Sequence, residues 1–257
     1  MARTYTALPL FVLAVGLLSA PARRAAAQEA PPAAPCPAGC DVDRPREGFG
    51  AGGISVGVGF LSLGKLNDRL TALGFEELSS TPIVVSGHGR GSIGKFVIGG
   101  RGGAFVSPNV KGTAPDGARL EANYTVGWGG AELGYALVNA GLFSVTPVAI
   151  VGAYGMTLFT TDDVKRSFGD TLTTPNRNTQ TTQGGALLGV SVPVDFRIAL
   201  KNDAEGDHAG IVIGLEPTFL YGIQLGDFAS GTKDTEDAPN VGLTGGYLAL
   251  SVGAGTW

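Results

Sequence analysis

Apolar and polar residues alternate with a period of two along much of the chain after residue 47. In residues 53–60, the large apolar side chains share one face, and glycine or serine fills the other. Residues 188–200 and 211–224 repeat this pattern over longer stretches. Because successive side chains of a β-strand point to opposite faces, the alternation predicts strands and not helices.

Applied to the whole chain, the alternation predicts eight strands. They cover residues 48–61, 81–90, 94–106, 118–138, 142–160, 183–200, 209–224 and 241–257. Each is long enough to cross a membrane as a tilted strand, which takes about 9–11 residues. Long and short links alternate along the chain, as they do in bacterial outer-membrane barrels, whose external loops are long and whose periplasmic turns are short. We therefore predict an all-β fold, an eight-stranded antiparallel up-and-down transmembrane β-barrel.

One segment in the first long link departs from the strand pattern. In residues 63–75, leucines recur at helical spacing from Leu63 to Leu73, and Gly74 is a natural C-terminal cap. A short amphipathic helix is therefore expected here. Its apolar stripe is expected to cover the mouth of the barrel, and the alternative is a contact with a partner or with lipid near the outer leaflet.

The start of the chain has the pattern of an export signal. A basic beginning precedes an apolar stretch at residues 7–20, and the small residues 25–27 fit a cleavage site. The apolar stretch is too short for a membrane-spanning helix, which needs about 20 residues. We expect residues 1–27 to be a signal peptide that directs the chain to the cell outer membrane.

Both cysteines, Cys36 and Cys40, lie just beyond this cleavage site. In an oxidising exported compartment, a local disulfide between them is the default expectation. The surrounding residues 28–47 are rich in proline and alanine, which predicts an extended periplasmic lead-in. The barrel domain is then expected to occupy residues 48–257.

Composition indicates whether the apolar face of the predicted strands points outward or into the interior of the barrel. The 257 residues include 42 glycines, and only 16% of them are charged, against about 25% charged in ordinary soluble domains. The glycines follow no three-residue period, which excludes collagen. A water-facing exterior of glycine, serine and threonine with so few charges would be unusual, whereas the same face suits a narrow lumen. The formal net charge of −4 gives no indication of nucleic-acid binding.

The few charged residues in the predicted strands have both signs in near balance. A closed internal network of paired charges requires such a balance. The residues expected to form this lumen network are Arg90, Arg101, Glu121, Glu132, Asp195, Arg197 and Glu216.

Motifs for catalysis or cofactor binding are incomplete. Residues 89–95 match the spacing of a phosphate-binding loop, but Phe96 stands where that loop needs serine or threonine, and a strand follows in place of a helix. We expect a hairpin turn there. Only two histidines, His88 and His208, occur, so a Ser/His/Asp triad or a zinc site of several His or Cys lacks parts. We predict no catalytic residue, cofactor or metal, and hence a non-enzymatic protein.

The exported, eight-stranded, alternating pattern ending in the aromatic Trp257 resembles the small outer-membrane β-barrel proteins of Gram-negative bacteria, such as the OmpA-type transmembrane domain. The resemblance covers roughly residues 48–257 and implies that Trp257 is a C-terminal signal read by the barrel-assembly machinery. The apolar ladder that ends at Ala254 runs one residue out of step with Trp257, and a bulge among the glycines would restore it.

The resemblance and the pattern together predict a monomer embedded in outer-membrane lipid. Its role is expected to be structural, adhesive or interactive, with any surface partner bound by the polar stretches 161–182 and 225–240. Two alternatives stay open. One is a small porin-like pore or solute conduit, although eight strands leave an interior just wide enough for their own side chains. The other is a soluble exported barrel that binds an apolar ligand.

Overall fold

The structure is a computed structural model. It describes residues 48–113, 117–162, 179–202, 208–230, 233–234, 239 and 241–257. The expected signal peptide, the lead-in and the pair Cys36 and Cys40 lie outside the described residues, as do most of residues 161–182 and part of residues 225–240. Within the described ranges, no helix has the length and hydropathy of a membrane span.

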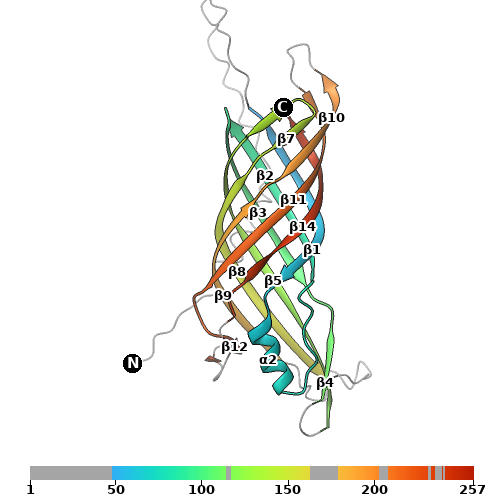
Figure 1. Ribbon diagram of the computed structural model, residues 1–257, viewed down its shortest axis with the longest axis vertical. Helices are drawn as coiled ribbons and strands as arrows, with labels where there is room; N and C mark the ends of the chain where they lie inside the picture. The colour runs from blue at the N-terminus through green and yellow to red at the C-terminus, as the bar shows by residue number, and fades with distance from the viewer. Residues whose placement is uncertain are drawn as a thin grey trace, which may run out of the picture. The chain divides into compact units, whose positions relative to one another are not determined.

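The fold is an antiparallel ring of eight hydrogen-bonded strands (Figure 1). The ring closes because the first strand pairs with the last along its whole length, from Gly50 opposite Thr256 to Leu61 opposite Gly245. In ring order the strands are β1 (Gly50–Leu61), β2 (Ile83–Ile93), β3 (Phe96–Val106), β5 (Arg119–Tyr135), β8 (Val148–Asp162), β9 (Thr179–Ser191), β11 (His208–Gln224) and β14 (Thr244–Thr256). Each lies within or close to one of the eight predicted strands, so the all-β antiparallel prediction is confirmed at this level.

Two predicted strands are each divided in two, and proline explains both breaks. The predicted strand 142–160 becomes β7 (Phe143–Val145) and β8, and Pro147 stands at the break. The predicted strand 183–200 becomes β9 and β10 (Val194–Asn202), and Pro193 stands between them. Proline has no N–H to give to a ladder. The two pieces β9 and β10 nevertheless pair in succession along the same strand, β11.

Four further short strands lie wholly or mostly in the predicted links. They are β4 (Val110–Thr113), β6 (Val138–Ala140), β12 (Ala229–Ser230) and β13 (Lys233–Asp234). The strand β4 extends the ladder of β5 past the ring. The predicted hairpin turn lies between β2 and β3, where Gly94 has a φ of +60° that favours glycine.

The two faces of each strand differ as the alternation predicts. On β1, Ile54 and Val56 are 64% and 55% exposed, whereas Ser55 between them is 1% exposed. The same outward row of large apolar side chains continues on the neighbouring strand, where Leu250 is 68% exposed. This apolar face is therefore turned away from the ring's interior, whereas the buried charged residues and a separate group of aromatic and aliphatic side chains are turned into it.

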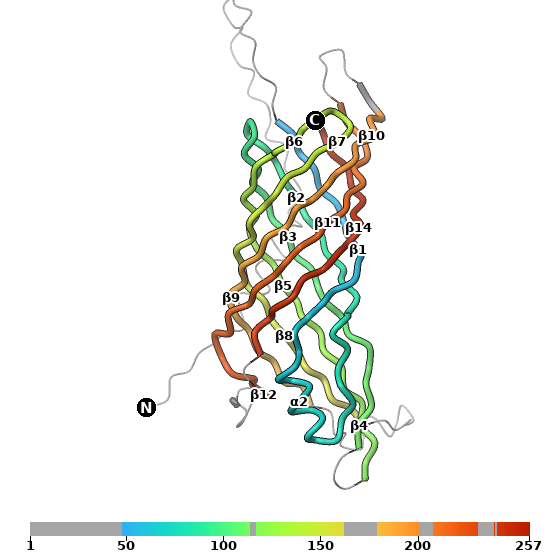
Figure 2. Tube along the Cα trace, in the orientation of Figure 1, coloured from blue at the N-terminus to red at the C-terminus, as the bar shows by residue number. Residues whose placement is uncertain are grey.

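The helix α2 (Gly64–Ala72) lies at the end of the ring opposite the C-terminus (Figure 2). It falls within the predicted segment, and Gly74 beyond it has a φ of +87°, in keeping with its predicted capping role. Leu66 and Leu70 are buried. Leu73, which the helical spacing placed on the same stripe, is 48% exposed, because the helix ends before it.

Candidate functional site

A cluster of charged side chains fills the middle of the ring. The carboxylate of Glu132 accepts hydrogen bonds from Nε of Arg90 at 2.8 Å and from Nε of Arg101 at 2.5 Å. Nη1 of Arg101 also donates to Oε2 of Glu216 at 2.9 Å. Nη2 of Arg90 lies 3.5 Å from Oε1 of the same carboxylate. Two guanidinium groups and two carboxylates thus balance each other, and all four side chains are almost fully buried.

Hydroxyl groups from further strands complete the cluster. Ser55 on β1 donates to Glu216 at 3.0 Å. Nη1 of Arg101 donates to the Tyr247 hydroxyl on β14 at 2.9 Å and lies 3.4 Å from the Thr218 hydroxyl on β11. The cluster therefore connects β1, β2, β3, β5, β11 and β14. A buried ionic group is favourable only when its polar atoms are paired.

Glycine makes the room that these long side chains need. A Cβ atom at Gly99 would lie 2.9 Å from Cγ of Arg90, and one at Gly214 would lie 2.6 Å from Oδ1 of Asp195. Both glycines share the inward face of their strands with a charged residue. The high glycine content is thus linked directly to the volume of the cluster.

Two of the other predicted network residues lie toward the C-terminal end of the ring. Asp195 on β10 is 3.9 Å from Nη1 of Arg90, at the edge of the cluster. Arg197 is outside it: the guanidinium lies over the rings of Phe49 and Trp257, at 5.2 Å and 5.6 Å from their centroids. It also donates a hydrogen bond to Oδ1 of Asn139 at 2.6 Å. Arg197 therefore joins the first and last parts of the ring and is separate from the central cluster.

Glu121 is not brought to the cluster. It is separated from Glu132 on β5 by an odd number of residues, and the register of β5 with its neighbours is unbroken. The two side chains must then lie on opposite faces of the strand. Oε2 of Glu121 accepts a hydrogen bond from Asn109 at 3.0 Å at the exposed end of the strand. The expectation that Glu121 faces the lumen is corrected on this ground.

His88 is a member of the cluster that the sequence reasoning missed. Its Nδ1 lies 3.1 Å from Oε1 of Glu216, and its side chain is 7% exposed. The signal was present in the sequence, because His88 and Arg90 are two residues apart on β2 and a strand places such residues on the same face.

Trp257 does not have the register that its predicted role requires. The ladders of β14 with β1 and β11 contain no shift from residue 244 to residue 256, so the expected bulge among the glycines is absent. Trp257 exchanges two backbone hydrogen bonds with His208, at 2.9 Å and 3.0 Å. It follows the inward positions of β14 in sequence parity, and the guanidinium of Arg197 lies 5.6 Å from the centroid of its ring.

Beyond the cluster, the interior at the α2 end is filled by apolar side chains. The ring of Trp128 lies 6.5 Å from that of Phe105 and 5.8 Å from that of Tyr247. Leu66 and Leu70 of α2 belong to the same buried core. Tyr247 belongs to both regions, because its hydroxyl meets Arg101 while its ring packs in the apolar core.

Asn67 joins the helix to the segment that follows it. The amide of Asn67 donates to the carbonyl of Leu78 at 3.1 Å and accepts from the N–H of Leu78 at 3.0 Å. These two hydrogen bonds resemble the two backbone hydrogen bonds that join paired residues of antiparallel strands. They fix α2 on the segment that leads into β2, with Leu63, Leu66 and Leu70 buried beneath it.

The charged groups of the cluster contact one another across the interior. In the part of the chain that the structure describes, no group of three or more His, Cys, Asp or Glu side chains is placed to hold a metal ion. The acidic groups of the cluster face arginines or a histidine. What the cluster does is join strands across the interior.

Comparison with known proteins does not assign the chain to a family. No protein-family model matches it. No curated protein matches it.

Proposed function

We propose that the chain is an integral outer-membrane protein whose strand ring spans the bilayer as a β-barrel. The observation that carries the proposal is the outward row of large apolar side chains, such as Ile54, Leu250 and Phe96, which are 64%, 68% and 68% exposed. Soluble monomers rarely expose contiguous apolar patches of more than a few hundred Å². In a membrane barrel, this face meets lipid. A soluble barrel for an apolar ligand would turn it inward.

The dimensions of the ring suit this role. The strand β1 has 12 residues, which at about 3.3 Å each and a tilt of about 40° rise about 30 Å. The apolar band of an outer-membrane barrel is about 25 Å tall. Aromatic side chains lie near both ends of the outward face: Phe60 and Tyr221 toward α2, and the edge-to-face pair Phe96 and Tyr135 toward the C-terminus. Such girdles are typical of the two membrane interfaces.

The interior supports a sealed barrel and not a pore. Arg101 and Glu216 meet across it, and beyond them the Trp128 and Phe105 rings and α2 occupy the space toward one end. A water path would have to pass both the ion cluster and the apolar core. We therefore prefer a structural or interaction role without catalysis, and the pore or solute conduit is the second candidate.

Under this proposal, the two ends of the ring lie on opposite sides of the membrane. With both termini of the ring in the periplasm, the end bearing α2 and β4 is external. The stretches 161–182 and 225–240 then emerge at the external end and are the expected sites of contact with a surface partner. Insertion by the barrel-assembly machinery and a monomeric state are part of the same proposal.

Fractionation and gel mobility test the membrane assignment. The protein is expected in the outer-membrane fraction after washing with alkaline carbonate. It should also migrate faster on gels in SDS when unheated than when boiled, because folded barrels resist the detergent. Recovery in the periplasm or medium without detergent would contradict the proposal.

Conductance in planar bilayers tests the second candidate. A sealed barrel is expected to give no reproducible current steps after insertion. Insertion should be verified in the same bilayer preparation by protease protection of the strands. Reproducible steps from protein that is shown to be inserted would favour the pore over the sealed barrel.

A further inference from the structure

A row of polar side chains crosses neighbouring strands near the C-terminal end of the ring. Ser144 on β7 lies directly opposite Asp195 on β10. Gly214 on β11 lies between Asp195 and Ser251 of β14 and is directly opposite both. Directly opposite residues of antiparallel strands share a face. Ser144, Asp195 and Ser251 are only 1%, 7% and 5% exposed, so the row points into the ring.

The side chains of this row have unused hydrogen-bonding capacity. Oγ of Ser144 and Oγ1 of Thr146, two residues further along β7, are buried without a partner among the described residues. The only cation near the Asp195 carboxylate at ion-pair distance is Nη1 of Arg90, at 3.9 Å, which is too far for a hydrogen bond. Within the described ranges, the Ser251 hydroxyl has no partner either. Buried polar groups are nearly always hydrogen-bonded, to protein or to ordered water.

The missing side chain of Gly214 leaves room beside the carboxylate. A Cβ atom at Gly214 would lie 2.6 Å from Oδ1 of Asp195 and closer still to Oγ of Ser251. The two oxygens therefore border the same position, and one small molecule can contact both. On the other side of Asp195, the hydroxyls of Ser144 and Thr146 share the inward face of β7. Each side of the carboxylate thus offers the two to four polar partners that a buried water needs.

The surrounding charges favour a neutral occupant over an ion. The buried charged residues of the described chain are balanced, three arginines against three carboxylates: Arg90, Arg101 and Arg197 against Glu132, Asp195 and Glu216. A bound cation would add a buried charge without a match, which is costly, and an anion would face the carboxylate of Asp195. Water donates to a carboxylate and accepts from a hydroxyl, so it suits both kinds of partner.

We infer that ordered water molecules are bound on both sides of Asp195. One bridges Asp195 to Ser251 over Gly214, and another joins Asp195 to the hydroxyls of β7. Ser251 lies directly opposite Ser55, which donates to Glu216 in the ion cluster. The bound water therefore extends the polar connections of the cluster to β10 and β7. The site is inside the ring, so the inference goes beyond the membrane proposal and does not depend on it.

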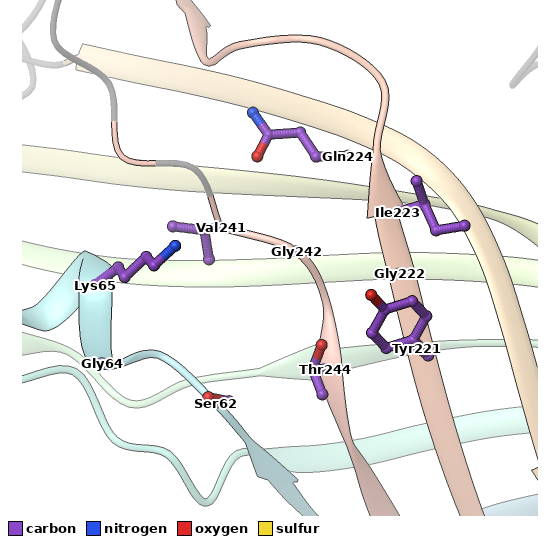
Figure 3. Close-up of a pocket in the computed structure, with 10 residues that line it drawn as sticks. All are labelled: Ser62, Gly64, Lys65, Tyr221, Gly222, Ile223, Gln224, Val241, Gly242 and Thr244. Carbon is purple, nitrogen blue, oxygen red and sulfur yellow. The ribbon is translucent and has the colours of Figure 1, made fainter.

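The site is distinct from the pocket of about 540 Å³ at the start of α2 (Figure 3). Lys65, Tyr221 and Thr244 contribute to the lining of that pocket, at the opposite end of the ring. Tyr221 is 51% exposed, whereas Asp195 is the most exposed polar member of the row at 7%. Water in the row is therefore enclosed by protein and has fixed partners.

A crystal structure of the full-length protein, at a resolution that shows ordered water, tests the inference directly. We expect one density peak about 2.6–3.2 Å from both Oδ1 of Asp195 and Oγ of Ser251, and a second at such distances from Ser144 and Thr146. Direct hydrogen bonds from the serine hydroxyls to Asp195, with no peak between them, would overturn the inference. Crystals grown with thallium in place of sodium test for a cation, and an anomalous peak at either position would also overturn it.

Two variants separate the two positions. Gly214→Ala places a methyl group beside Ser251 and should remove the first peak while the second stays. The variant is expected to fold, because the nearest atoms that the methyl group meets are ends of side chains. Ser144→Ala should remove the second peak and leave the first. Gly129→Ala is the matched control, since its new Cβ would meet nothing closer than 3.7 Å, and both peaks should stay. Two peaks unchanged in Gly214→Ala and Ser144→Ala would contradict the assigned partners.

A second measurement uses the unchanged protein in lipid vesicles and needs no variant. Solid-state NMR compares the rate of magnetisation transfer from water to the carboxyl carbons of Asp195 and Glu132. Glu132 accepts hydrogen bonds from Arg90 and Arg101 and is the internal reference. Transfer to Asp195 is expected to be several-fold faster, and equal rates at the two carboxylates would contradict bound water at Asp195.

Discussion

Arg101 and Glu216 meet at 2.9 Å from strands on opposite sides of the ring. Four steps from strand to strand separate β3 from β11 in either direction around the ring. Both side chains are 0% exposed. One ion pair thus connects two walls of the interior that share no backbone hydrogen bond, and Glu132 and Arg90 extend the connection to the neighbouring strands.

The ion cluster is expected to stabilise the fold measurably. Replacing one partner, in Arg101→Met or Glu216→Gln, leaves a buried charge without its match, which typically costs about 3–5 kcal/mol. The free energy of unfolding in urea, measured on protein folded into lipid vesicles, should fall by this amount. Arg119→Gln, at an exposed strand end, is the control and should change it by less than about 0.5 kcal/mol. Equal stability of all three variants would show that the cluster adds nothing.

Asn67 is expected to control the opening of α2. Asn67→Leu removes two hydrogen bonds to Leu78, each worth about 0.5–1.5 kcal/mol, without removing the buried leucines. Amide hydrogen exchange in residues 64–72 should accelerate about five- to hundredfold, since each 1.4 kcal/mol is a factor of ten. The strands of the ring should exchange as in the unchanged protein. Asp68→Ala, an exposed position on the same helix, is the matched control, and acceleration of equal size there would contradict a specific role for Asn67.

A charge on the outward face should cost more at mid-strand than at the strand end. Leu250→Arg places a guanidinium in the middle of β14, where the cost in a membrane barrel is about 2–4 kcal/mol. Thr256→Arg places the same group at the end of the strand, where the cost is about 0–1 kcal/mol. The measurement is the free energy of folding into vesicles. A similar small effect at both positions would mean that the outward face meets water.

Much of the architecture follows from the period-two pattern. Ser55 is buried between two exposed neighbours on β1, as alternation requires of any strand with one apolar face. The breaks at Pro147 and Pro193 were also visible in principle, because proline cannot continue a ladder. The alternation in residues 188–200 runs across Pro193, which outweighs this signal and predicts a single strand there.

The site was harder to predict than the fold. Residues an even number apart on a strand share a face. This rule separates Glu121 from Glu132 and groups His88 with Arg90, so it places both Glu121 and His88 correctly from the sequence alone. The alternation does not show that Glu216 and Arg101 lie at the same height along the axis of the ring. The level at which two distant strands meet depends on the stagger accumulated around a closed ring, and no local stretch of sequence contains that quantity. The separation of Arg197 from the cluster has the same cause.

The most direct test of the central claim, that the outward face of the ring meets lipid, is a spin-label accessibility measurement. Single cysteines are introduced at the outward Leu250 and at the inward Ser251, with Cys36 and Cys40 replaced by serine, and labelled protein is folded into vesicles. The label at position 250 is expected to collide with oxygen far more often than with a water-soluble nickel chelate, and the label at position 251 to be shielded from both. More frequent collisions with the nickel chelate than with oxygen at position 250 would contradict the claim.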